Sequence, residues 1–207
     1  MMIKCLKNSA FTLIEMLLAL AILGVVAASL FSIFAGGMKI SQRSTQGDRL
    51  NHEIFWVSRL LSTDVENAVS VKLVDTQGQP KNIFEGTADH LTLALDTENG
   101  LKKISYYLNP IEGSGLANLM REEKDIILDE KKSAEPEIIA NHLALDGLKF
   151  LYGYQEKDKP VEWQTSWKPD GVPAKMKAEI DFVLDPKTLE KKTLTLEIYH
   201  PNGTLNE

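Results

Sequence analysis

The sequence predicts an α+β fold in which a long N-terminal helix, transmembrane in its first half, packs on an antiparallel β-rich domain. Two observations support this prediction. No charged residue occurs between Met16 and Met38, as expected for a membrane span. After Val69 the spacing of apolar residues changes from the period of a helix to the two-residue period of strands. With 207 residues, the chain is long enough for one span and one globular domain of ordinary size.

Residues 1–10 form a short basic leader. They include Lys4 and Lys7 and no acidic residue, a charge asymmetry that favours the cytoplasmic side of a membrane. A small residue, Ala10, stands at the border between this leader and the apolar stretch. An ordinary secretory signal has its cleavage site after the apolar core instead. Cleavage at Ala10 would therefore leave the apolar helix on the mature protein.

Residues 11–35 are predicted to be the transmembrane part of the helix. As a helix this segment is about 37 Å long, enough to cross a hydrocarbon core of about 30 Å. Glu15 is the only charged residue in it. A carboxylate inside a membrane is unfavourable unless a cation meets it, so Glu15 is a candidate functional residue. The alternative is an interfacial residue whose side chain reaches the cytoplasmic headgroups.

The helix is predicted to continue beyond the membrane over residues 36–69. Apolar residues recur there at steps of three and four, at Leu50, Ile54, Val57, Leu61 and Val65, which predicts one packed face. Phe55 and Trp56 stand beside this stripe and are expected to widen the packed face. Gly47 opposes the prediction, because an interior glycine costs about 1 kcal/mol relative to alanine.

Residues 70–207 are predicted to form the β-rich domain. Strands are expected at 70–74, 90–95, 103–108, 116–121, 138–145 leading into 148–154, 174–184 and 193–199. Asn99-Gly100 predicts a hairpin with a type I′ turn between the second and third of these strands. The charged stretches 121–125 and 129–132 mix both signs and are interpreted as solvated faces or loops.

The N-terminal residues resemble a known signal. Lys7-Asn8-Ser9-Ala10 followed by Phe11-Thr12-Leu13-Ile14-Glu15 is similar to the class III, or type IV prepilin, signal, with Ala10 where that family usually has glycine. The resemblance implies cleavage by a prepilin peptidase between Ala10 and Phe11 and N-methylation of Phe11. It also implies that Glu15 pairs with the N-terminus of a neighbouring subunit during assembly, an attraction that is strong in a low-dielectric environment. Gly24 is interpreted either as the point where such helices loosen or as an ordinary small packing residue.

The order of motifs in the second half resembles the J-type minor pseudopilin of the type II secretion system. The motifs are Tyr106-Tyr107-Leu108, Leu119-Met120-Arg121-Glu122, Leu148-Lys149-Phe150 with Tyr152 and Tyr154, Trp163, Trp167, and Val172-Pro173 before a strand. The resemblance implies a single-pass protein of the cell inner membrane with its C-terminal domain in the periplasm. It also implies a place at the pseudopilus tip, with I-type, K-type and major pseudopilins and exported protein substrates as partners.

Two alternatives remain open at this point. One is a minor pilin of a type IV or competence pilus, which shares the same N-terminal signal. The other is a membrane-tethered ligand-binding or sensory domain, whose helix is only an anchor. A simple anchor needs neither a cleavable basic leader nor an acid four residues past Phe11. The N-terminal residues therefore favour the pilin-like interpretations.

Enzymatic, metal-binding and nucleic-acid functions are not predicted. The four histidines, His52, His90, His142 and His200, lack a metal-ligand spacing, and no nucleophile elbow or phosphate-binding loop occurs. The only cysteine, Cys5, lies in the leader. Asp125, Asp129 and Glu130 lack the ligand spacing of an EF-hand loop. The net charge is −6, or −8 once Lys4 and Lys7 leave with the leader, which disfavours phosphate backbones as partners. We therefore expect no catalytic residue, cofactor, metal or nucleic acid.

Overall fold

The computed structural model describes residues 13–74, 78–126, 135–155, 159–185 and 188–203, with the backbone alone for residues 39–47. The chain divides into two compact units, residues 1–50 and 51–207. A single helix, α1 (Leu13–Glu66), contributes to both units. Each unit is therefore described in turn.

The first unit consists, in its described part, of the N-terminal part of α1. Leu13–Met38 is the segment of this helix that is long and apolar enough to cross a membrane. At a rise of about 1.5 Å per residue, its 26 residues extend about 39 Å, more than the thickness of a hydrocarbon core. The predicted apolar N-terminal helix is thus confirmed.

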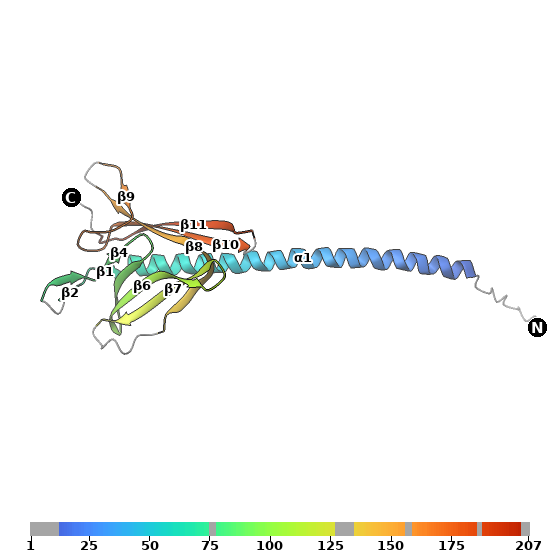
Figure 1. Ribbon diagram of the computed structural model, residues 1–207, viewed down its shortest axis with the longest axis horizontal. Helices are drawn as coiled ribbons and strands as arrows, with labels where there is room; N and C mark the ends of the chain where they lie inside the picture. Colours follow the sequence, from blue (N-terminus) through green and yellow to red (C-terminus); the bar gives the residue numbers. More distant parts are fainter. Residues whose placement is uncertain (1–12, 75–77, 127–134, 156–158, 186–187, 204–207) are drawn as a thin grey trace, which may run out of the picture. The chain divides into compact units, whose positions relative to one another are not determined.

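The second unit contains a large antiparallel sheet and a small hairpin (Figure 1). In the described part of the chain the large sheet has nine strands, in the order β1-β5-β6-β7-β8-β10-β11, with β4 beside β5 and β9 beside β8. The strands are β1 (Ala68–Val69), β4 (Glu85–Gly86), β5 (Leu91–Thr97), β6 (Gly100–Ile111), β7 (Leu116–Asp125), β8 (Glu137–Tyr154), β9 (Glu162–Gln164), β10 (Lys175–Asp185) and β11 (Glu190–Tyr199). The separate hairpin pairs β2 (Lys72–Val74) with β3 (Pro80–Asn82). An apolar helix followed by a mostly antiparallel sheet confirms the predicted α+β class.

Strand β8 changes partners along its length. Its first half pairs with β7, its second half pairs with β10, and its last residues pair with β9. The register shifts between these halves, where His142 has a positive φ of 59°, as expected of a bulge that bends a strand. The N–H of Phe150 also donates a 2.7 Å hydrogen bond to the carbonyl of Ala88. This bond ties the segment between β4 and β5 to the second half of β8.

The core lies between the C-terminal part of α1 and one face of the sheet. On the helix, Val57, Leu61 and Val65 are at most 1% exposed, as the stripe of apolar residues predicts. On the sheet, the buried face includes Leu91, Leu93, Ile104, Tyr106, Leu119, Phe150, Met176 and Ile180. On β10 the buried residues alternate with more exposed ones, the pattern of a strand with one packed face. On β5 the residues between Leu91 and Leu95 are buried as well, so this strand is covered on both faces.

The prediction for Phe55 and Trp56 is wrong. Their side chains are 63% and 50% exposed, although Val57, the next residue, is fully buried. Successive residues of an α-helix point about 100° apart, so residues directly before Val57 turn away from its face. The packed stripe is consequently narrower than the apolar residues of the sequence suggest.

The hairpin between β5 and β6 is confirmed, but its predicted turn type is wrong. Thr97 pairs with Gly100, so the two turn residues are Glu98 and Asn99. Gly100 has a φ of 104°, whereas Asn99 is not among the described residues with positive φ. A type I′ turn needs positive φ at both central residues. The glycine instead follows the turn, where its conformational freedom lets the chain enter β6.

Two further expectations need correction. The helix does not reach the predicted end at about Val69, because α1 ends at Glu66 and Val69 belongs to β1. The charged stretch 121–125 is not the predicted solvated face or loop, because it forms the second half of β7. Arg121 in this stretch has a side chain that is only 14% exposed, because it contacts α1. The stretch 129–132 lies outside the described residues.

Candidate assembly site

The structure describes one of the three residues of the predicted N-terminal site. Glu15 lies in the first turn of α1 with an exposed side chain. A carboxylate is favourable there, because the N-terminal end of a helix carries partial positive charge. Ala10 and Phe11, the predicted residues of cleavage and methylation, lie outside the described residues. The structure therefore does not show these three residues together.

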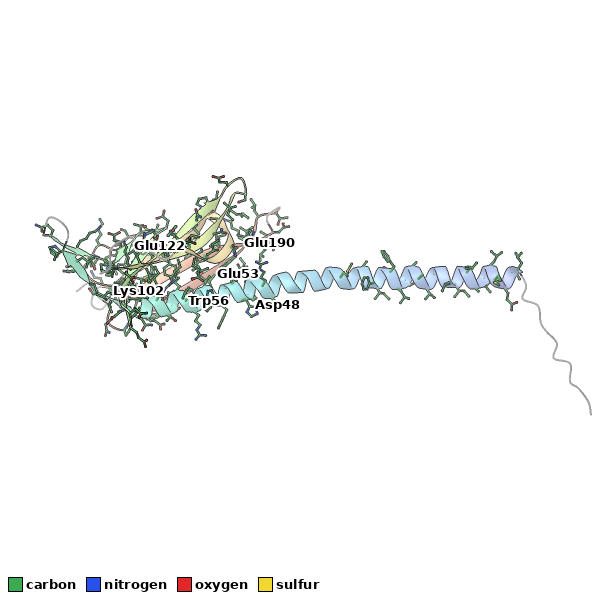
Figure 2. The ribbon with its side chains drawn as sticks, turned by 90° about the horizontal axis from the view of Figure 1, so that it is seen from below. Asp48, Glu53, Trp56, Lys102, Glu122 and Glu190 are labelled. Atoms are coloured by element: carbon green, nitrogen blue, oxygen red, sulfur yellow. The ribbon has the colours of Figure 1, made fainter. Side chains whose placement is uncertain are left out.

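In the first unit, the segment Leu13–Met38 presents an apolar surface on all sides of the helix. From Leu13 to Met38 the large apolar side chains are between 49% and 79% exposed, and Figure 2 shows side chains projecting on opposite sides of this segment. The hydroxyl of Ser29 donates a 2.8 Å hydrogen bond to the carbonyl of Val25 within the helix, which satisfies a polar group that lipid cannot. A helix that is apolar all round has to be covered by lipid or by other apolar helices.

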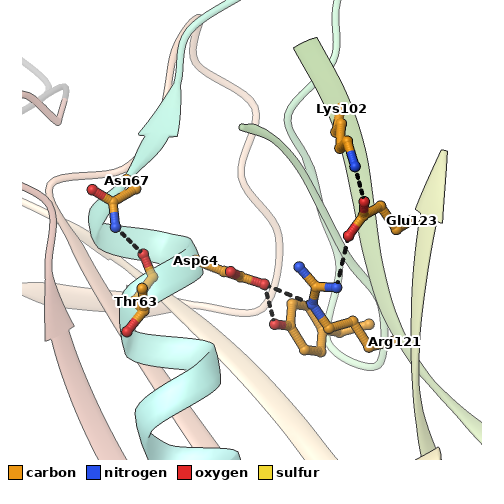
Figure 3. Close-up of polar contacts among 7 residues, drawn as sticks. Thr63, Asp64, Asn67, Lys102, Arg121 and Glu123 are labelled. Carbon is orange, nitrogen blue, oxygen red and sulfur yellow. Dashed lines mark hydrogen bonds and ion pairs between the residues drawn. The ribbon is translucent and has the colours of Figure 1, made fainter. Parts of the chain in front are cut away.

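In the second unit, α1 is fixed to the sheet through a buried carboxylate. One oxygen of Asp64 accepts a 2.5 Å hydrogen bond from the hydroxyl of Tyr106 on β6 and a 2.9 Å hydrogen bond from Nε of Arg121 on β7 (Figure 3). Tyr106 and Arg121 are directly paired across β6 and β7, so they project from the same face of the sheet. Asp64 is 5% exposed. This pairing sets the position of the last turns of α1 over β6 and β7.

The ionic contacts continue from Arg121 along the sheet. Its second donor, an Nη atom, lies 3.1 Å from a carboxylate oxygen of Glu123, and Lys102 on β6 donates to the other oxygen of Glu123 (Figure 3). Two carboxylates and two cations thus alternate along a short chain. Each charge has an opposite neighbour, which is what makes partly buried ionic groups tolerable.

The pKa values of these groups reflect their partners. The hydrogen bond from Lys102 holds the pKa of Glu123 below its usual range, against the opposing effect of burial. The same bond raises the pKa of Lys102. Burial tends to lower the pKa of Arg121, but its hydrogen bond to Asp64 and the charge of Asp64 outweigh burial and raise it. Burial, followed by the charge of Asp64, raises the pKa of Tyr106. All four groups therefore keep their ordinary ionisation states around neutral pH.

The end of α1 explains why Asp64 needs a cation. The last turn of the helix contains no basic residue, although the C-terminal end of a helix carries partial negative charge. Asp64 adds a further negative charge at this end, and Arg121 compensates for it from the sheet. The carbonyl of Thr63 accepts a 3.1 Å hydrogen bond from the backbone N–H of Asn67 and a 2.8 Å hydrogen bond from its side-chain amide, so Asn67 closes the last turn of the helix twice.

Strand β11 is also joined to the helical part of the second unit. Nζ of Lys192 donates a 3.2 Å hydrogen bond to the side-chain oxygen of Asn51 on α1. After the strand, Nε2 of His200 donates a 2.7 Å hydrogen bond to the carbonyl of Ala68, and its Nδ1 accepts from the N–H of Asn202. These two bonds place the donor of the imidazole ring at Nε2 and its acceptor at Nδ1. The Lys192 bond thus connects β11 to Asn51 on α1, and the His200 bond connects the end of β11 to Ala68 in β1, just after the helix.

Asp64 was not singled out from the sequence, although a signal was present. It lies three residues after Leu61 and directly before Val65, so the helical period places it on the apolar stripe. A charged residue at such a position needs a buried partner. Tyr106 and Arg121 both occur in the motifs quoted above, but nothing in the sequence pairs either of them with Asp64.

The histidines and acidic residues of the described chain do not gather into a metal site. In residues 13–203, apart from the segments that the structure leaves undescribed, no group of three or more His, Cys, Asp or Glu side chains could hold a metal ion. The ring of His90 instead stacks on the ring of Tyr107, and its Nε2 lies 2.9 Å from Oγ1 of Thr92. The hydroxyl of Thr92 also forms a 3.0 Å hydrogen bond with the hydroxyl of Ser105. His142 occupies the bulge of β8.

The comparison with known families identifies the N-terminal segment. The family model described as the prokaryotic N-terminal methylation motif matches residues 5–37. This match includes the Ala10-Phe11 junction, Glu15 and nearly all of the apolar helix. The chain thus carries a prepilin-type motif on a single apolar helix followed by a β-sheet domain. These features support a membrane-anchored, type IV pilin-like protein with a structural role, processed by a prepilin peptidase and assembled with other pilin-like subunits.

Proposed function

We propose that this protein is a J-type minor pseudopilin of the type II secretion system, which forms part of the pseudopilus tip and helps to start fibre assembly. The observation that carries the proposal is the prepilin-type motif at residues 5–37 on a helix that continues into an antiparallel domain. The order of motifs in that domain, from Tyr106 to Val172-Pro173, supports the J-type assignment. The role is structural and involves no catalytic turnover.

Processing is proposed at the junction of Ala10 and Phe11. A prepilin peptidase would cleave after Ala10 and leave Phe11 as the methylated N-terminus of the mature chain. The leader of residues 1–10 would be lost, and residues 11–35 would remain as the membrane and assembly segment. The new N-terminal amine would be cationic and would stand four residues before Glu15 in the sequence.

Glu15 is proposed to guide subunit docking. Its carboxylate lies in an otherwise uncharged stretch, where an opposite charge attracts it much more strongly than in water. A neighbouring subunit's N-terminal amine offers such a charge at the same depth in the membrane. The surrounding apolar side chains, all exposed in the isolated chain, would pass from contact with lipid to contact with other helices as the subunit enters the fibre.

The domain of residues 51–207 is proposed to lie in the periplasm and to contact the I-type, K-type and major pseudopilins and exported proteins. The leader is basic, with Lys4 and Lys7, and favours the cytoplasmic side, so the opposite end of a single span lies across the inner membrane. The Asp64 contact holds α1 to this domain. Forces on the helix during assembly would therefore reach the sheet through Arg121 and Tyr106.

A minor pilin of a type IV or competence pilus is the second candidate, because the methylation motif is common to both classes. The two differ in their partners. We expect cross-linking in cells to join this chain to pseudopilins, and deletion of its gene to block protein export while leaving surface pili intact. Loss of pili with normal export would support the minor pilin instead.

Processing is tested by intact mass and N-terminal sequencing of the full chain, made with and without an active prepilin peptidase. We expect a mature chain that begins at methylated Phe11 only when the peptidase is active. The variant Ala10→Gly should be processed, whereas Ala10→Leu should not, because a bulky residue replaces the small one at the cleavage site. An unprocessed wild-type chain, or one cut after the apolar segment, would favour a membrane-tethered ligand-binding domain.

A further inference from the structure

We draw no further inference here: the strongest candidate, the exposed face of α1 that presents Phe55 and Trp56, is an aromatic surface patch outside the sheet contact, and nothing in the described part of the chain shows what covers it.

Discussion

The carboxylate of Asp64 in the last turn of α1 accepts a 2.9 Å hydrogen bond from Nε of Arg121 on β7. The two residues are 57 positions apart in the sequence, and their side chains are only 7% and 14% exposed. Removing one partner from a buried ion pair leaves an uncompensated charge, which is more damaging than the loss of the contact alone. The pair therefore makes the attachment of the helix to the sheet sensitive to single substitutions.

Arg121→Met should lower the free energy of unfolding by about 3 to 5 kcal/mol, because Asp64 then stays buried without a cation. The measurement is urea unfolding of the full chain in a mild detergent, monitored by tryptophan fluorescence. Lys124→Met is the matched control on the same strand. Lys124 pairs with Glu122 but is 46% exposed, so its loss should change stability by less than about 1 kcal/mol. Equal effects of the two variants would contradict a special role for the buried pair.

The contribution of Glu123 to the free energy of unfolding should depend on pH. Its pKa is held below the usual value of 4.5, chiefly by the hydrogen bond from Lys102. The unfolded chain therefore binds a proton first as the pH falls, and the stability that Glu123 contributes above its unfolded pKa is lost as the pH falls through its folded pKa. We expect the wild type to exceed Glu123→Gln in stability at pH 7 and this advantage to shrink below about pH 4.5.

The measurement is the free energy of unfolding of both chains at a series of pH values between 7 and 3. Glutamine keeps an oxygen that accepts from Lys102 but has no proton to titrate, so the comparison isolates the charge. A difference between the two chains that stays constant over this range would show that Glu123 does not contribute through its ionisation.

Two tyrosines should resist ionisation in the folded protein. Burial raises the pKa of both Tyr106 and Tyr152, and the chain has five tyrosines in all. In an absorbance titration at alkaline pH, Tyr106→Phe should leave the amplitude of the folded protein unchanged and reduce the amplitude after unfolding by about a fifth. A drop in the folded amplitude would mean that Tyr106 is accessible and that its contact with Asp64 is open.

Gly86 should tolerate no side chain. A Cβ atom there would lie 2.4 Å from Cζ of Tyr152, well inside contact distance, and Gly86 also pairs with Trp167. We expect Gly86→Ala to lower the free energy of unfolding by about 1 to 3 kcal/mol through overpacking. The clash is with the end of one ring, so the same substitution in a Tyr152→Leu background should have a smaller effect. If the effects of the two substitutions on the free energy of unfolding are simply additive in a double-mutant cycle, the strain does not come from contact with Tyr152.

The local features of this fold were accessible from the sequence, since they depend on short-range patterns. The apolar run after Glu15 defines a helix by its length, and Val57, Leu61 and Val65 define its packed stripe. Phe55 and Trp56 were placed wrongly because hydrophobicity alone does not fix the direction of a side chain. Their position in the helical turn does, and it points them away from the sheet.

The contact between Asp64 and Arg121 could not be derived in this way. It depends on the register of β6 against β7, which brings Tyr106 opposite Arg121. A mixed run of charges such as 121–125 is usually solvated, and in a strand only alternate residues share a face. Arg121 and Glu123 lie on the same face of the sheet as Lys102, and this face contacts α1. The contact with the helix therefore buries charged residues that, in most sequences, would be exposed to solvent. The N-terminal motif, in contrast, could be recognised from the sequence because its residues are contiguous.

Glu15→Gln should separate processing from assembly. The substitution leaves the Ala10-Phe11 junction intact, so the mature N-terminus should form at the wild-type level. Without the carboxylate the neighbouring subunit's amine loses its partner in the membrane, and we expect the fraction of mature chain cross-linked to other pilin-like subunits to fall about tenfold or more, because unpairing a buried charge costs several kcal/mol. Ser29→Ala, whose hydroxyl bonds only within the helix in the described contacts, is the matched control and should assemble normally. If Glu15→Gln cross-links normally, the charge of Glu15 is not needed for assembly. If the variant is not processed, Glu15 instead acts in recognition by the peptidase.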